Sequence, residues 1–376
     1  MGANVLGGDS MQSVHDHGID ALKILSMFMV VVLHVLGLGG VLERAEPLSG
    51  TYCAAWLLEC GAYCAVNCFA MCSGYVSVGR RVKAGNLLKL WLQAAFYTIL
   101  ITAVMSAVKP ERYLNAAYWL KAVFPVTTKQ YWYFTAYFGL FFLMPLLNAA
   151  MERMSRGVCF ILTGAAAVVF ALIPSAARTD TFSLSEGYST MWVVLMYLVG
   201  GAIKRGNLFE TKRRWIWAVA FAASVFVTWG SKIAAEAVLL KMSGQFRTVN
   251  VLVRYTSPSV VVSAAALIKL FGGMEIRSTR KVRLIEKLSP LCFGVYLIHV
   301  SPIMIELYYG QLGFMAELGT VLMVPSVILT AAAVYLACSG ADAVRRMLFS
   351  AVGADRLCRS LTTWTENFMR RPDGVK

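Results

Sequence analysis

The sequence predicts an all-α, polytopic membrane protein, a bundle of about ten transmembrane helices. Of its 376 residues, 58% are hydrophobic and only 15% are charged, a balance far from that of soluble domains. Apolar stretches long enough to cross a bilayer recur along the whole chain. They cover residues 20–39, 54–78, 87–108, 131–150, 158–174, 190–203, 215–231, 249–271, 288–308 and 319–338.

The distribution of basic residues predicts the orientation of this bundle. Most of the 35 Lys and Arg residues fall in segments that are cytoplasmic if the N-terminus lies inside. We therefore expect both termini to be cytoplasmic, with an N-terminal tail over 1–19, a membrane domain over 20–339 and a basic tail over 340–376. The net charge of +15 then reflects topology and contact with anionic membrane lipids. We expect no nucleic-acid partner, because the sequence shows no basic, aromatic-rich surface module.

The first span carries ionisable residues within an otherwise apolar run. Asp20 and Lys23 lie near its start, and His34 follows Lys23 by eleven positions. Eleven residues turn a helix through ~1100° and rise ~16 Å, so Lys23 and His34 share one face at different depths. Ionisable groups are costly in a bilayer and usually mark functional sites. A purely structural hydrogen bond of His34 to a neighbouring helix is the alternative.

Two more polar residues are predicted at the depth of His34. Counting helical rise from the membrane surface places Glu59 of the second span and His299 of the ninth at this level. We expect them to share a polar cavity with His34 and to take part in catalysis, with Glu59 orienting the imidazole. Alternatively, Glu59 lies closer to the headgroups and His299 makes a structural hydrogen bond.

The loop after the second span is a candidate site for an anionic ligand. It carries Arg80, Arg81 and Lys83 on the side that we expect to be cytoplasmic. Guanidinium groups pair well with phosphate, so these residues and Lys23 form a candidate binding set for a phosphate-rich cytosolic ligand. The alternative is ordinary positive charge of an inner loop.

An aromatic segment at the outer end of the fourth span, QYWYFTAY, is a candidate sugar-stacking or cavity-lining surface. Its alternative role is that of an interfacial aromatic belt. The candidate cavity residues are Asn67, Tyr131, Trp132, Tyr133 and Tyr137. We predict no metal site, because the cysteines at 60, 64, 68 and 72 lack zinc-binding spacing and suit helix packing.

Five segments, in chain order, resemble motifs of the family 3 membrane acyltransferases. They are IDALKILSMFMVVVLH, FAMCSGY, RRVKAGNLLKLW, QYWYFTAYFGLFFLMPLLN and LSPLCFGVYLIHVSPI. Together these segments span almost the whole membrane domain. His34 stands at the family's catalytic histidine, and Lys23 stands where the family usually has arginine. Arg81 and Lys83 correspond to residues implicated in donor handling. The resemblance thus implies that Lys23 and the basic loop bind the donor and that the cavity residues around the aromatic segment bind the acceptor.

The resemblance implies an O-acyltransferase of the inner (plasma) membrane, and we expect a bacterial one. It would move an acyl group, expected to be acetyl, from cytosolic acyl-CoA to a hydroxyl of an envelope glycan, lipid-linked sugar or small molecule. His34 would act as the general base, and acyl-CoA would be a co-substrate, with no permanently bound cofactor. The alternative function is a transporter or flippase of a glycan or lipid precursor, although the sequence shows no internal repeat.

Overall fold

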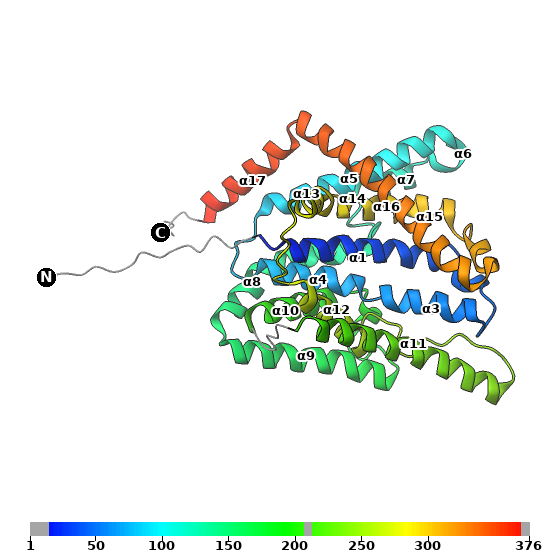
Figure 1. The fold of residues 1–376 in the computed structure, drawn as a ribbon. Coiled ribbons are helices and arrows are strands. Elements are labelled where there is room, and N and C mark those ends of the chain that lie inside the picture. Colours follow the sequence, from blue (N-terminus) through cyan, green and yellow to red (C-terminus); the bar gives the residue numbers. More distant parts are fainter. Residues whose placement is uncertain (1–14, 207–212, 370–376) are drawn as a thin grey trace.

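The computed structural model describes residues 15–206 and 213–369, where all regular secondary structure is helical (Figure 1). The long helices are α1 (His17–Leu36), α3 (Gly50–Ala62), α4 (Ala65–Ser77), α5 (Ala84–Val108), α8 (Trp132–Arg153), α9 (Arg156–Ala177), α10 (Thr190–Gly206), α11 (Trp215–Ser243), α12 (Pro258–Phe271), α16 (Gly319–Ala351) and α17 (Ala354–Met369). The shorter helices are α2 (Val41–Arg44), α6 (Pro110–Tyr113), α7 (Ala116–Val123), α13 (Thr279–Leu288), α14 (Cys292–His299) and α15 (Pro302–Tyr308).

Seven helical segments of the described chain are long and apolar enough to cross a membrane, namely α1, α3 with α4, α5, α8, α9, α11 and α16. An eighth is obtained if the pair 279–299 and 302–308, bent by 67°, counts as one broken span. The remaining predicted segments coincide with α10 and α12, of 17 and 14 residues, which are short for a crossing. The count of ten spans and the cytoplasmic termini therefore stay predictions. Helix α16 continues to Ala351, so the predicted domain boundary at 339 falls inside a helix.

Helix α1 runs through the middle of the bundle (Figure 1). It contacts α3, α4, α12, α13, α14 and α16. The carboxylate of Asp16 caps its first turn by accepting a hydrogen bond from the Ile19 amide at 3.1 Å. Because α1 has neighbours on several sides, the residues of its polar face meet other helices rather than lipid.

Helices α4 and α10 cross at very short range. A methyl group at Gly74 would overlap the Tyr197 carbonyl, and one at Gly200 would overlap the Met71 carbonyl. Small residues permit such close helix approach in membrane bundles. The four cysteines predicted to pack in this region are buried, free thiols. This contact fixes the position of α4, which carries the SGY segment.

A buried polar network joins α5 to α16, and α14 packs against it. The carboxylate of Asp342 accepts hydrogen bonds from Gln93 at 3.0 Å, Tyr97 at 2.8 Å and Arg345 at 2.7 Å. Gly294 of α14 lies against this carboxylate with no room for a methyl group. Several partners compensate the buried charge, as such a charge requires. The orientation of α14 is thereby set.

The C-terminal helix α17 returns to the N-terminal end of α5. Thr362 accepts a hydrogen bond from the Gly85 amide at 3.1 Å, and Lys89 pairs with Asp355 at 2.9 Å. The hydrogen bond from Lys89 lowers the pKa of the Asp355 carboxyl below its ordinary value.

Candidate active site

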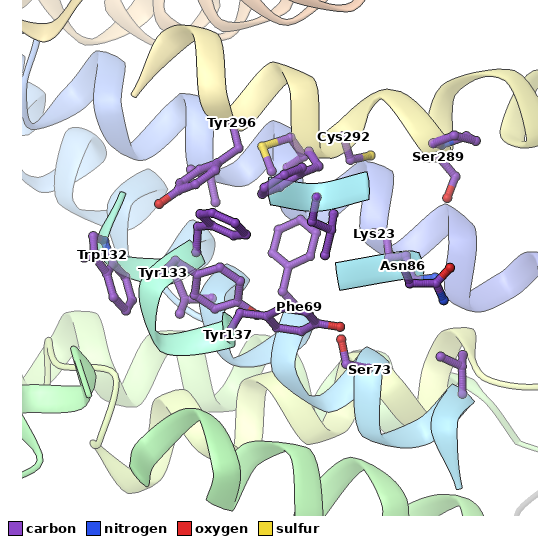
Figure 2. A pocket seen from close by; sticks show the side chains of 18 of the residues that line it. Lys23, Phe69, Ser73, Asn86, Trp132, Tyr133, Tyr137, Ser289, Cys292 and Tyr296 are labelled. Atoms are coloured by element: carbon purple, nitrogen blue, oxygen red, sulfur yellow. The ribbon is translucent and has the colours of Figure 1, made fainter. Parts of the chain in front are cut away.

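A cavity of about 390 Å³ lies between α1, α4, α5, α8 and α14. Lys23, Asn86 and Ser289 line one end of it, whereas Trp132 lies at the opposite end (Figure 2). His34 also lines the cavity, eleven residues and ~16 Å along α1 from Lys23. One continuous space thus connects a cation with an imidazole, as the spacing in the first span predicts.

Lys23 is held by a carboxylate but is not sealed from the surface. Its ammonium group lies 2.9 Å from Asp20 Oδ1, one turn earlier on α1. The Lys23 side chain is 29% exposed, whereas that of Asp20 is 11% exposed. A partly exposed cation whose partner is anchored in the helix suits contact with an anionic ligand.

His299, the second histidine predicted at this depth, is in direct contact with His34. His34 Nδ1 lies 3.0 Å from His299 Nε2. His299 is 4% exposed, and its Nδ1 lies 2.6 Å from the Val295 carbonyl oxygen one turn earlier on α14. The structure therefore brings together two residues that are 265 positions apart in the chain.

These two hydrogen bonds define the tautomers of the neutral imidazole pair. A carbonyl oxygen only accepts, so His299 Nδ1 must carry the proton that faces Val295. The apolar surroundings disfavour a cationic ring, which leaves His299 Nε2 as an acceptor for the His34 Nδ1 proton. His34 Nε2 is then unprotonated and able to accept a proton. This is the arrangement of a general base positioned by a second group.

Two tyrosines of the cavity wall offer unpaired hydroxyls. The hydroxyls of Tyr133 and Tyr296 are buried and have no hydrogen-bond partner within the described residues. Both residues line the cavity, and their rings meet edge to face with centroids 6.4 Å apart. Buried polar groups are normally satisfied, so two free phenol groups here favour a ligand with oxygen acceptors.

Glu59 does not line this cavity. It lies on α3, is 8% exposed, and its Oε2 atom has no hydrogen-bond partner in the part of the chain that the structure describes. The His34 nitrogen for which a carboxylate partner was expected bonds instead to His299. The depth predicted for Glu59 by counting rise stays a prediction, and the structure does not place Glu59 among the residues that line the cavity with His34.

The predicted aromatic and amide residues divide into two groups. Trp132, Tyr133 and Tyr137 line the cavity, as expected for an acceptor surface. Tyr131 instead donates a hydrogen bond to the Leu297 carbonyl at 2.9 Å. Its hydroxyl thus ties α8 to α14.

Asn67 is likewise bonded to protein rather than lining the cavity. Its amide nitrogen donates to the Tyr255 carbonyl at 2.9 Å, and its oxygen accepts from Trp192 Nε1 at 2.9 Å. Tyr255 does line the cavity. Asn67 therefore acts on the cavity wall through the backbone of Tyr255.

The basic loop lies beside the Lys23 end of the cavity. Arg80, Arg81 and Lys83 are exposed in the connection between α4 and α5, outside the lining residues. Their neighbours in sequence, Ser77 and Asn86, do line the cavity. Both ends of the loop thus adjoin the cavity, whereas its three charged side chains do not line it.

Several residues that line the cavity were not predicted as site residues from the sequence. Ser73, Cys292 and Tyr296 lie within the FAMCSGY and LCFGVY segments, so these motifs were the available signal. Tyr255 lies in an irregular segment before α12, and no motif marks it. The Tyr255 ring contacts the rings of Trp132 and Tyr63, which are far from it in the sequence and meet it only in the folded chain.

Comparison with known proteins identifies the family. No curated protein and no solved structure matches this chain. A family described as an acyltransferase domain, Acyl_transf_3, matches residues 16–340, which include the whole cavity. Together with the apolar helices, this match indicates a multi-pass integral membrane protein. The chain belongs to the family 3 acyltransferases.

Proposed function

We propose that this protein is a membrane O-acyltransferase that moves an acyl group, expected to be acetyl, from acyl-CoA to a hydroxyl. The expected acceptor is an envelope glycan, a lipid-linked sugar or a small molecule. The observation that carries the proposal is the cavity with Lys23 at one end and the tautomer-fixed His34 farther along. The expected location is the bacterial inner membrane, with the donor arriving from the cytosol.

The donor would bind through the Lys23 end of the cavity. Its phosphates would meet Lys23 and the loop cations Arg80, Arg81 and Lys83, while its thioester arm extends along α1 toward His34. The ~16 Å rise between Lys23 and His34 is of the same order as an extended pantetheine arm. Binding both substrates in one water-poor space supplies proximity, which contributes much of the acceleration in acyl transfer.

His34 would act as the general base. Its Nε2 takes the proton of the acceptor hydroxyl as that oxygen attacks the thioester carbonyl. The resulting imidazolium keeps its Nδ1 hydrogen bond to His299, which becomes charge-assisted. When the C–S bond breaks, the leaving thiolate recovers the proton from His34. The products are the ester and free coenzyme A.

The unpaired phenols suggest how the tetrahedral intermediate is stabilised. Hydroxyl donors aimed at a developing oxyanion are a common device of acyl-transfer sites. Tyr133 and Tyr296 line the same cavity as His34 and have free hydroxyls. Each is assigned as a donor to the oxyanion.

The test is acyl transfer by the purified protein in detergent, measured as coenzyme A release and as labelled acyl group on a panel of sugars. His34→Ala should lower turnover by roughly 100-fold or more, the usual contribution of a general base. Tyr133→Phe and Tyr296→Phe remove one hydroxyl each and should lower kcat more than they change donor affinity.

Phe28→Leu, which substitutes a partly buried α1 residue outside the cavity lining, is the matched control and should retain activity. Near-normal turnover of His34→Ala would remove this histidine from the mechanism. Coenzyme A release requires no sealed compartment, so this assay also distinguishes the enzyme from a transporter.

A further inference from the structure

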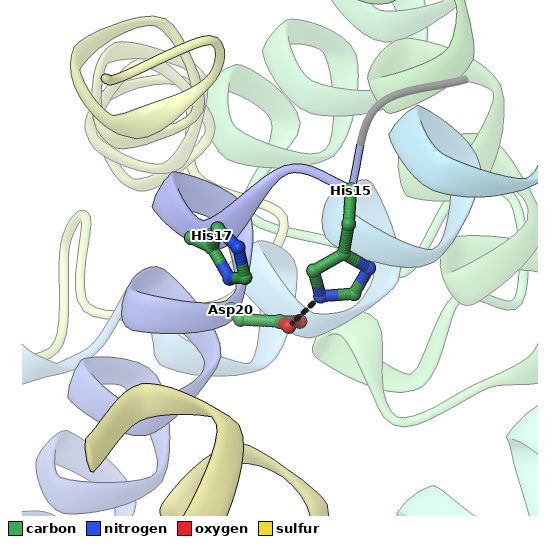
Figure 3. Close-up of side chains that lie close together, drawn as sticks. All are labelled: His15, His17 and Asp20. Carbon is green, nitrogen blue, oxygen red and sulfur yellow. Dashed lines mark hydrogen bonds and ion pairs between the residues drawn. The ribbon is translucent and has the colours of Figure 1, made fainter. Parts of the chain in front are cut away.

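Three potential metal ligands converge at the beginning of α1, away from the His34 pair. They are His15, His17 and Asp20 (Figure 3). One ligand atom from each lies within 4.8 Å of the others. His15 Nε2 is already 2.6 Å from Asp20 Oδ2. His15 and His17 lie outside all five motif segments.

The unpaired nitrogen of His17 points to a ligand. Its Nδ1 is buried and has no hydrogen-bond partner within the described residues. Its Nε2 lies 4.0 Å from a carboxylate oxygen of Glu286 on α13. A histidine that binds a metal through one nitrogen commonly directs the other N–H at a carboxylate. A proton on Nε2, on the side of Glu286, would leave Nδ1 of His17 free to bind.

The spacing and the charge of the cluster suit a first-row divalent cation. Ligand atoms around tetrahedral zinc lie roughly 3.4 Å apart. The ligand atoms here lie within 4.8 Å of one another, so the widest pair must close by up to about 1.4 Å, while the His15–Asp20 pair at 2.6 Å must open. The His15 side chain is 60% exposed and is able to make this movement. Asp16, Asp20 and Glu286 contribute negative charge nearby, and Lys23 pairs with Asp20. A set of two imidazoles and one carboxylate favours zinc over magnesium or calcium.

We infer that His15, His17 and Asp20 form a binding site for a zinc-type divalent cation, with Glu286 as the outer partner of His17. This inference departs from the sequence-based expectation of no metal site. It is independent of the acyl-transfer proposal, because metal binding is measured without substrate. The site would join the segment before α1 to the start of the helix and, through Glu286, to α13.

The experiment uses the full chain in detergent, purified through an affinity tag without histidine. The protein is stripped with a chelator and titrated with Zn²⁺, and bound metal is counted by mass spectrometry. Co²⁺ then serves as a probe whose visible absorption reports coordination by nitrogen and oxygen. We expect one metal ion per chain. His15→Ala and His17→Ala should each weaken binding at least ~10-fold, and Glu286→Gln by a smaller factor.

Asp16→Asn is the matched control. It removes a negative charge between the two histidines and keeps the side-chain oxygen that caps the helix at Ile19, although the Gly273 amide loses its carboxylate acceptor. Affinity within ~3-fold of wild type is expected for this variant. An equal loss in Asp16→Asn and His17→Ala would overturn the inference in favour of diffuse attraction, as would unchanged binding in both histidine variants. His17→Gln, with its thermal unfolding midpoint recorded beside each titration, separates loss of a ligand from loss of folding.

Discussion

Replacing His299 with alanine tests whether the second histidine positions the first. In the structure, His299 Nε2 accepts the proton of His34 Nδ1 at 3.0 Å, and the Val295 carbonyl fixes the His299 ring from behind. Without His299, His34 is free to adopt the other tautomer, with the proton on the nitrogen that has to act as base. The imidazolium formed in the reaction also loses its acceptor. We expect kcat to fall while the donor KM changes little.

The expected magnitude follows from the hydrogen bond that is lost. A hydrogen bond to a charged group contributes about 1.5–3 kcal/mol. This bond is charged only after proton transfer, so the loss applies chiefly to the transition state. At 1.36 kcal/mol per factor of ten, kcat should fall ~10- to ~150-fold. His299→Gln provides an amide oxygen that can accept from His34, and it should recover part of the activity.

The assay compares His299→Ala with Tyr131→Phe, both measured by coenzyme A release under saturating donor. Tyr131→Phe removes one buried hydrogen bond to the same helix, α14, without contact to His34. Both variants should lose stability, about 1 kcal/mol for the tyrosine, but only His299→Ala should lose kcat strongly. A similar kcat for both variants, or no recovery with His299→Gln, would refute the positioning role and leave His299 a structural residue.

Three further variants test the cavity and its support. Gly294→Ala should destabilise the protein by about 1–3 kcal/mol, since its methyl group would overlap the fully bonded Asp342; an unchanged thermal midpoint would contradict that packing. Glu59→Gln should retain transfer within ~3-fold of wild type, because Glu59 does not line the cavity, whereas a selective loss of acceptor transfer would restore the catalytic role expected from its depth. Lys23→Gln should weaken coenzyme A binding by ~5-fold, about 1 kcal/mol for a partly exposed charge, and Lys23→Arg should be tolerated or improved; calorimetry checks both.

The sequence by itself determined the helical class and the arrangement along each helix. The common face of Lys23 and His34 follows from eleven residues at ~100° each, a property of one helix that needs no neighbour. The motif segments likewise located most of the cavity wall, including Tyr133 and Tyr137. Apolar stretches located every long helix except α17, which lies in the predicted basic tail. Whether the shorter helices α10 and α12 cross the membrane is not decided by their length and composition.

The tertiary structure decided which of the residues predicted at one depth meet. Glu59 and His299 are both predicted at the level of His34 by counting rise, yet only His299 contacts it. Rise along a helix is local, whereas contact depends on which helices are neighbours and which faces they turn to each other. Here the neighbours are set by close packing, such as that of Gly294 of α14 against Asp342, and by buried hydrogen bonds, such as that from Gln93 to Asp342. These pairings join segments hundreds of residues apart, so no local pattern in the chain specifies them.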